Sequence, residues 1–241
     1  MKTSLPVLMY HSIRKPGRRE IMKGMHVKPS SLGWQMRLLS KLGFKGTSLR
    51  EALQLKQMDP SAKVVALTFD DGYFNFFSDA LPILVSHKFS ATVYVPTARI
   101  GQTNLWDENK GIHMQSLMTK EHLQKCICEN IEIGCHSMTH SDLTHTSSDL
   151  SIEIYKAKSE LELSLGTETS SFCYPFGLYN QEVMNILKRA GFTNAVTMRR
   201  GLFSGEDDIF QIPRVPITWH TMPHAYLLKL LTSYEDKRRR Q

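Results

Sequence analysis

The sequence contains no apolar run that approaches the roughly 20 residues a membrane-spanning helix needs. Its N-terminus, MKTSLPVLMYHS, carries an apolar patch that is too short for the core of a secretory signal and has no small-residue cleavage site after it. We therefore expect no export signal and a cytoplasmic protein, with any contact to the inner membrane limited to its periphery.

Cysteine is also scarce, which argues against a disulfide scaffold and against a site built on paired thiolates. The four cysteines include no CxxC pair; they are Cys126, Cys128, Cys135 and Cys173. We expect reduced and mostly buried thiols, since free cysteine packs as a small apolar side chain.

The net charge is +7, yet the chain has no recognised nucleic-acid motif and no basic stripe interleaved with aromatic residues. Basic residues gather at 14–19 and in the tail 235–241. We expect solvated, flexible charge and no nucleic acid as partner; a weak attraction to an anionic membrane or a lipid-linked substrate is the alternative. Nothing in the sequence indicates the oligomeric state.

The chain also lacks low-complexity linkers, breaks in composition and internal repeats, so we expect residues 1–241 to form one domain with a short basic C-terminal tail. Hydrophobic residues make up 41% and charged residues 22%, as in soluble globular proteins. Predicted strands and helices alternate. The strands are 5–11, 63–70, 91–97, 131–137, 170–175 and 194–198; the helices are 29–44, 48–58, 75–88, 119–130, 148–165, 180–191 and 222–234.

About seven β/α repeats predict an α/β fold, a distorted (β/α) barrel of about seven parallel strands. An open doubly wound sheet is the main alternative. The segment 211–217 contains two prolines, which indicate an edge strand or an irregular segment.

Polar residues stand at the ends of several predicted strands. They are His11, the pair Asp70 and Asp71, His136, and the turn Pro175–Gly177. In α/β folds the carboxyl ends of parallel strands meet on one side of the sheet, where functional residues collect. We therefore expect these residues to converge.

The segment GCHSMTH (134–140) places His136 and His140 four residues apart. On a helical turn the two imidazoles would share a face and could bind one ion. Asp71 is the candidate carboxylate that completes a site of two histidines and one aspartate. Two surface histidines without a ligand role are the alternative, particularly as His145 lies close by.

These motifs resemble the polysaccharide deacetylase (NodB-homology) family, carbohydrate esterase family 4. LTFDDGY (67–73) and IGCHSMTHSDL (133–143) contain the family's TFDDG and H[ST]xxH motifs intact, and FCYPFG (172–177) resembles its third motif, RxPYG. PVLMYHSI (6–13) resembles the subgroup of exopolysaccharide deacetylases that act on β-1,6-linked N-acetylglucosamine. The resemblance spans residues 6 to about 217 and implies a NodB-like barrel.

The resemblance also implies a role for each residue. Asp71, His136 and His140 would bind a divalent metal, for which Zn²⁺ is our first choice and Ni²⁺, Co²⁺, Fe²⁺ or Mn²⁺ are alternatives. Asp70 would be the general base that takes a proton from the attacking water. His11 would be the general acid that protonates the leaving amine, unless it is an ordinary buried histidine at a strand end.

The third motif would contact the substrate oxyanion through Pro175, Phe176 and Gly177, mainly by the backbone N–H of Phe176. Its usual arginine, which tunes the base, is Cys173 here. Arg214 is the nearest substitute, with an ordinary structural arginine as the alternative. The family's C-terminal Leu-x-His is absent.

That absence favours His11 as the acid and leaves His220 and His224 as outside candidates. Trp106 and Asp107 lie in a long loop, where the indole would form a floor for a sugar ring or simply pack against the fold.

The implied function is a metal-dependent hydrolase that removes an N-acetyl group from an amino-sugar saccharide or from a glycolipid or nucleotide-sugar precursor and releases acetate. One alternative is the deacylation of a non-sugar amide. A second is a carbohydrate-binding module that kept the site but lost turnover, with Cys173 as the warning sign.

Overall fold

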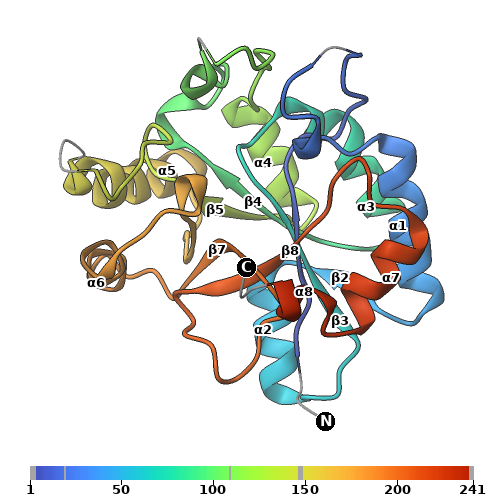
Figure 1. The fold of residues 1–241 in the computed structure, drawn as a ribbon. Helices are drawn as coiled ribbons and strands as arrows, with labels where there is room; N and C mark the ends of the chain where they lie inside the picture. Colours follow the sequence, from blue (N-terminus) through green and yellow to red (C-terminus); the bar gives the residue numbers. More distant parts are fainter. Residues whose placement is uncertain (1–3, 19, 109, 146–148, 239–241) are drawn as a thin grey trace.

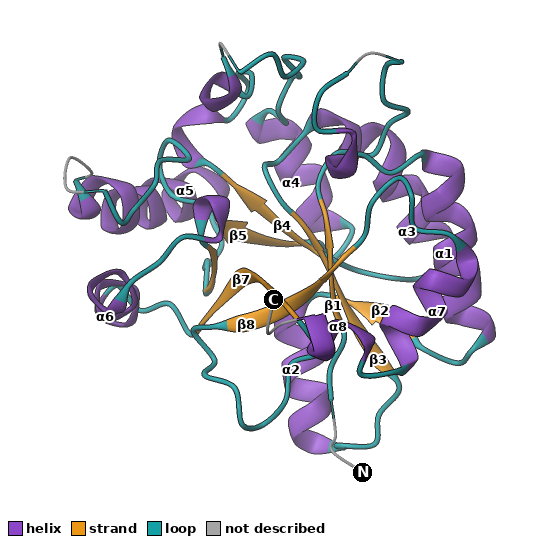
Figure 2. Cartoon of the chain, in the orientation of Figure 1, coloured by secondary structure: helices purple, strands orange, loops and turns teal. Residues whose placement is uncertain are grey.

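The computed structural model describes residues 4–18, 20–108, 110–145 and 149–238, in which parallel strands form a closed ring surrounded by helices (Figures 1 and 2). The ring runs β1-β8-β7-β6-β5-β4-β3 and closes between β3 and β1. The strand β2 is not part of the ring and pairs with β3. All of these pairings are parallel. The predicted barrel of about seven strands is confirmed, and an open sheet is ruled out because β1 pairs on both of its edges.

The strands are β1 (Val7–Tyr10), β2 (Lys45–Thr47), β3 (Val64–Phe69), β4 (Thr92–Val95), β5 (Glu132–Cys135), β6 (Ser171–Cys173), β7 (Asn194–Arg200) and β8 (Ile212–Pro216). The helices are α1 (Pro29–Lys41), α2 (Leu49–Met58), α3 (Leu81–Ser86), α4 (Lys120–Cys128), α5 (Ala157–Leu165), α6 (Gln181–Arg189), α7 (Pro223–Leu231) and α8 (Tyr234–Arg238). Among the described residues, no helix combines the length and apolar character required to cross a bilayer.

The helices begin and end where their sequences provide capping groups. The Ser48 side chain accepts a hydrogen bond from the Glu51 N–H at the start of α2, and Thr119 does the same for His122 at the start of α4. Gly166 ends α5 in the left-handed conformation, with φ 68°. These caps confirm the predicted positions of three helix termini.

Four features differ from the sequence-based predictions. The segments expected as helices 75–88 and 148–165 begin with π-helical turns at Phe76–Ala80 and Ser151–Lys156. The expected last helix is divided into α7 and α8. The short strand β2 was not predicted, because its sequence Lys-Gly-Thr carries no hydrophobic pattern.

The expectation of an edge strand at 211–217 is wrong, whereas the expected irregularity is present. β8 pairs with both β1 and β7, and the register shifts between Val196 and Arg200 of the neighbouring strand. Hydrogen bonds next to Pro216 maintain the pairing of this strand, because the Ile217 N–H donates to the carbonyl oxygen of Met9 at 3.0 Å.

Alternation along the strands determines which residues face the interior of the ring. Val7, Ala66, Cys173, Val196 and Ile212 belong to one buried cluster that α2 also joins. Continuing the same period-two alternation toward the carboxyl ends of the strands places further side chains on the interior side. They are Met9 in β1 and His11 directly after it, Thr68 in β3 and Asp70 directly after it, and Arg214 in β8.

Basic charge is not all solvated. The expectation of flexible charge is wrong for Arg14, which pairs with Glu20 and also donates a hydrogen bond to Gln115. Residue 19 and residues 239–241 of the two basic segments lie outside the described residues. The four cysteines are free; all but Cys128 are buried, as predicted.

Candidate active site

Asp70 and Asp71 follow β3 and point to different partners, because the backbone turns sharply between them. Asp71 has φ 73° and Gly72 has φ 68°, both in the left-handed region. A Cβ on Gly72 would lie 2.8 Å from Cγ1 of Val95, so only glycine fits. Left-handed backbone at a non-glycine residue such as Asp71 is costly and is concentrated at functional sites.

Asp70 forms a two-pronged ion pair with Arg214. The Nη1 and Nη2 atoms of Arg214 donate to Oδ1 and Oδ2 of Asp70, each at 2.7 Å, and both side chains are buried. Burial alone would raise the pKa of the Asp70 carboxyl, but the guanidinium reverses this and holds that pKa below its usual value. The carboxylate at position 70 is therefore kept ionised by an internal cation.

The remaining donors of Arg214 are also satisfied. Nε donates to the carbonyl oxygen of Thr197 at 2.9 Å, and Nη1 also reaches Oγ1 of Thr68 at 3.1 Å. The sulfur of Cys173 lies 3.4 Å from Nη2. The side chain at position 173 therefore faces the guanidinium directly, although it comes from a different strand.

Asp71, His136 and His140 form a buried group whose potential ligand atoms all lie within 4.8 Å of one another. Oδ1 of Asp71 is 3.4 Å from Nε2 of each histidine. Nδ1 of His136 lies 2.7 Å from the carbonyl oxygen of Cys173, a contact that fixes the ring orientation. These three residues could hold one metal ion.

The chemistry of this group fits a divalent cation. Oδ2 of Asp71 and Nδ1 of His140 are buried without a hydrogen-bond partner in the described part of the chain, which is unusual for buried polar atoms. Burial opposes ionisation of Asp71, but the contacts from His136 and His140 hold its pKa well below the usual range. An ionised carboxylate beside two imidazoles is a typical N/O donor set for zinc and related metals.

The two histidines converge by a different route from the one expected. His136 follows β5 directly, but the segment that continues to His140 is a loop and not a helical turn. Ser137 and His140 have φ 64° and 67°, and the His140 N–H donates to Oγ of Ser137 at 3.0 Å. The prediction that a helical turn places His136 and His140 on one face is therefore wrong, although the two rings do share one site.

His11 lies beside this group at the end of β1. Its Nε2 is 3.7 Å from Oδ2 of Asp70, and its side chain is 15% exposed, so it faces the cavity above the ion pair. The outside candidates His220 and His224 are exposed and do not line this cavity.

The turn Pro175–Gly177 follows β6 and carries two consecutive left-handed residues, Phe176 with φ 57° and Gly177 with φ 70°. A Cβ on Gly177 would lie 2.7 Å from Cβ of Met198. The ring of Phe176 meets His140 edge-on, with centroids 4.6 Å apart. The third motif thus adjoins the metal-binding group.

Trp106 stacks on the other side of His140, with centroids 4.4 Å apart and an interplanar angle of 21°. It also lines a cavity of about 600 Å³ that contains His11, Asp70, Asp71, His136 and His140 among its walls. The ring of Trp106 therefore packs against a candidate ligand and also faces the cavity, and its role as a floor for a sugar ring stays a prediction.

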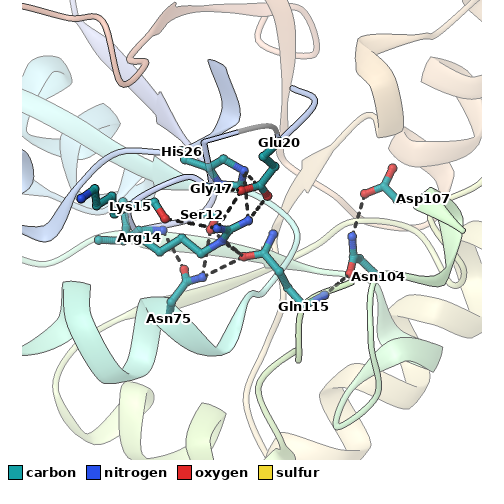
Figure 3. A network of polar contacts seen from close by, with 11 residues as sticks. Ser12, Arg14, Lys15, Gly17, Glu20, His26, Asn75, Asn104, Asp107 and Gln115 are labelled. Atoms are coloured by element: carbon teal, nitrogen blue, oxygen red, sulfur yellow. Dashed lines mark hydrogen bonds and ion pairs between the residues drawn. The ribbon is translucent and has the colours of Figure 1, made fainter. Parts of the chain in front are cut away.

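A polar network braces the loops that form the cavity walls (Figure 3). Oε1 of Gln115 accepts from Oγ of Ser12 and Nε of Arg14, each at 2.8 Å, and from Nδ2 of Asn75 at 3.2 Å. Asn104 extends the network, because its Oδ1 accepts from the Gln115 backbone N–H at 2.6 Å. These contacts join segments that follow β1, follow β3 and precede α4.

The network ends on one side at Asp107, whose Oδ2 accepts from Nδ2 of Asn104 at 2.8 Å. On the other side Arg14 pairs with Glu20, which lies 3.2 Å from Nε2 of His26. Burial lowers the pKa of His26 to about 4, so it is neutral at pH 7. Four members of this network were not predicted from the sequence: Asn104, Gln115, Glu20 and His26. The only signal for them was the position of Ser12 and Asn75 beside the candidate catalytic motifs.

Comparison with known proteins agrees with this arrangement. YxkH of Bacillus subtilis (strain 168) is 27% identical over 217 residues, which cover 89% of this chain and 71% of the relative. The poly-β-1,6-N-acetyl-D-glucosamine N-deacetylase of Staphylococcus aureus (strain N315) is 25% identical over 261 residues, covering 98% of this chain and 86% of the relative.

Among solved structures, the Streptococcus pyogenes deacetylase PplD in complex with acetate is similar with a TM-score of 0.82 at 25% identity, covering 95% of this chain and 99% of PplD. Residues 57–195 match the family model for polysaccharide deacetylase. Because this match covers more than half of the chain, the protein belongs to the polysaccharide deacetylase family.

Proposed function

We propose that this protein is a metal-dependent hydrolase that removes an N-acetyl group from an amino-sugar saccharide, or from a glycolipid or nucleotide-sugar precursor, and releases acetate. One observation carries the proposal: the adjacent carboxylates have separate partners. Asp71 adjoins two imidazoles, whereas Asp70 is bound by Arg214 and adjoins His11. A ligand and a base can therefore be next to each other without competing for one partner.

Asp71, His136 and His140 would hold the ion, with Zn²⁺ as the first choice and Ni²⁺, Co²⁺, Fe²⁺ or Mn²⁺ as alternatives. Such an ion polarises an acyl carbonyl and makes bound water more acidic. The chain prepares the ligand set in advance, because the Cys173 carbonyl fixes the His136 ring and because Trp106 and Phe176 confine the His140 ring.

Asp70 would act as the general base. Each of its oxygens accepts one hydrogen bond from Arg214, which leaves a lone pair on each oxygen for a proton from the attacking water. The same guanidinium fixes the carboxylate plane, so the base is oriented before substrate binds. Arg214 would thus serve the purpose for which other members of the family use an arginine of the third motif.

His11 would supply the proton to the leaving amine. Its Nε2 lies 3.7 Å from Asp70 Oδ2, so a proton taken up at position 70 has a short route to the imidazole. The turn Pro175–Gly177 would support the oxyanion through the backbone N–H of Phe176, a role that does not require the tyrosine usual in the family.

We also propose that the chain acts as one catalytic domain. The strands that carry the site residues extend from β1 to β8, and these two strands pair with each other to close the ring. Removal of either β1 or β8 would therefore open the barrel.

The test is acetate release from N-acetylglucosamine oligomers by the wild type and by Asp70→Asn, with metal content measured on the same samples. We expect Asp70→Asn to lose about 10²–10⁴-fold in rate while it keeps its metal. The exposed Asp59→Asn is the matched control and should remain fully active. Replacement of Asp71, His136 or His140 by alanine should remove the metal.

Two results would contradict the proposal. If all three ligand variants retain stoichiometric metal, the site assignment is wrong. If the wild type binds the oligomers but releases no acetate, and Asp70→Asn behaves identically, the protein is a carbohydrate-binding module. Acetate release from a small acylated amine but not from any sugar would support the non-sugar deacylase instead.

A further inference from the structure

The walls of the active-site cavity are mostly apolar, which is unexpected for a site that would bind only sugar hydroxyl groups. Four methionines line it, namely Met9, Met22, Met25 and Met198. Ile21, Ile112 and Ile217 also contribute. Saccharide hydroxyls need hydrogen-bonding partners, whereas thioether and branched alkyl side chains provide none.

Apart from the proposed catalytic and metal-binding ones, the polar side chains among the described wall residues all contact other parts of the protein. They are Asp107, Lys110, Tyr174 and Thr218, whose Oγ1 lies 3.4 Å from Oγ1 of Thr221. Asp107 accepts a hydrogen bond from Asn104 and lies 3.9 Å from Nζ of Lys110. The same Nζ lies 5.0 Å from the centroid of the Phe176 ring. The Tyr174 hydroxyl donates to the carbonyl oxygen of Phe210. The cavity therefore offers a substrate far more apolar contact than free hydrogen-bonding capacity.

The apolar surface continues from the floor of the cavity to its opening. Met9 is 5% exposed, whereas Ile21 and Met22 are each 53% exposed and Met198 is 47% exposed. Ile21 also bridges the two wall loops, because its Cδ1 lies 2.9 Å from the position that a Cβ on Gly111 would occupy. An apolar group could thus extend from the metal-binding centre to the surface without leaving this lining.

The volume of about 600 Å³ is in the range of cavities that hold drug-sized ligands, and is far larger than an acetyl methyl group requires. Methionine is flexible and polarisable, and it adapts to apolar groups of varied shape. Flat aromatic rings suit the faces of sugar rings, but methionine and isoleucine suit an alkyl chain better.

From this lining we infer that the substrate carries an alkyl chain of several carbons beside the amino sugar, and that Met22, Met25 and Met198 bind this chain. The inference rests on the proposed hydrolysis of the amide of an amino sugar and specifies its substrate class; with a long N-acyl group, the acid released would be longer than acetate. The chain has two potential sources, a long N-acyl group that is itself released or an alkyl group attached to the sugar as aglycone.

The test compares two substrate series with the full-length protein and a saturating divalent metal. One series varies the acyl group of methyl glucosaminide from acetyl to hexanoyl. The other varies the aglycone of N-acetylglucosamine from methyl to octyl. Release of free amine is measured for both series.

Each additional methylene that is buried should increase kcat/KM about fourfold, so a gain of at least about tenfold is expected across one series. The series that shows the gain identifies the source of the chain. Calorimetric titration of metal-free protein with the longest and shortest members of that same series should show the same preference for the longer chain, independently of turnover.

Met22→Gln is the informative variant, because the side chain is half exposed and its replacement does not open a core cavity. We expect the ratio of kcat/KM between long-chain and methyl substrates to fall by about fourfold or more. Met58→Gln is the matched control, since Met58 is 83% exposed and lies on α2 away from the cavity. It should keep the wild-type ratio.

Amine release from the short substrates with no gain in either series would overturn the alkyl-chain inference and leave the deacylase function intact. A gain with the number of sugar units in place of methylenes would overturn it as well. No release from any amino-sugar substrate would refute the proposed function, and this inference with it.

Discussion

Removal of the buried ion pair between Asp70 and Arg214 is the sharpest test of how the site is built. Both side chains are almost completely buried, at 3% and 1% exposure, and they share two hydrogen bonds of 2.7 Å. Truncating one partner leaves the other charge buried without its counter-ion, which costs about 3–5 kcal/mol. For a chain of this length each kcal/mol lowers Tm by about 2–4 °C. Arg214→Met should therefore lose about 6–20 °C.

The pairwise energy follows from a double-mutant cycle with Arg214→Met, Asp70→Asn and the double variant, measured by denaturant unfolding in a chelating buffer so that metal binding does not contribute. We expect the double variant to be more stable than the sum of the single losses predicts, with a coupling energy of about 2–3 kcal/mol. Arg199→Met is the control, because this arginine is exposed and should change stability by less than about 0.5 kcal/mol. Strict additivity of the two single variants would refute the ion pair.

The same geometry predicts that the guanidinium can be supplied from the other strand. Cys173 Sγ lies 3.4 Å from Nη2 of Arg214. The side chain of an arginine at position 173 would therefore start next to the place that the Arg214 guanidinium occupies. The double variant Cys173→Arg with Arg214→Cys should recover part of the deacetylase rate that Arg214→Cys loses. If the double variant is no faster than Arg214→Cys, the two strands are not interchangeable as the source of the charge.

Three further predictions concern the scaffold. His26 has a folded pKa of about 4, below its unfolded value of 6.5, so the unfolded state gains a proton first and stability falls as pH decreases from 6.5 to 4. In urea titrations at several pH values, His26→Gln should lack on the order of 3 kcal/mol of that loss. Parallel curves of stability against pH for the variant and the wild type would contradict this prediction. Gly72→Ala should destabilise the fold by about 1–3 kcal/mol in thermal unfolding, because residue 72 has a positive φ and an added Cβ would meet Val95. Gly33→Ala is the control and should be neutral or stabilising, because this position is helical and an added Cβ would meet no other part of the fold within 4 Å. Equal effects of the two substitutions would refute this reasoning. Gln115→Ala should leave buried donors unpaired and lower the stability of the fold by about 1–3 kcal/mol. It should also increase backbone amide hydrogen exchange in 101–118; unchanged exchange there would show that the network does not hold the cavity wall.

The fold was largely predictable because the signals for it are local. Strands such as Val64–Phe69 are continuous apolar runs, and helices carry caps such as Thr119 directly before their first residue. The strand ends at His11 and Asp70 were placed correctly, since period-two alternation sends both side chains to the interior of the ring. The number of ring strands followed from counting these repeats.

The features that sequence did not predict depend on partners distant in the chain or on unusual backbone. Two prolines made 211–217 look like an edge, yet this strand pairs with a neighbour on each side, β1 and β7. The four-residue spacing of His136 and His140 suggested a helix, but left-handed residues bring the rings together instead. Arg14 looked like a solvated charge because nothing local reveals Gln115, which lies 101 positions away in the sequence.

Two adjacent carboxylates are stable in this fold because the backbone, and not only the local charges, separates their environments. Asp70 belongs to the regular alternation of β3 and therefore meets Arg214 inside the ring. Asp71, at φ 73°, leaves that alternation and turns to the two histidines. The left-handed backbone at Asp71 thus turns this carboxylate away from Arg214, so that it remains available as a ligand while Asp70 stays paired with the guanidinium. Since this separation is set by Gly72 and Val95 as much as by charge, we expect it to persist if the guanidinium comes from position 173.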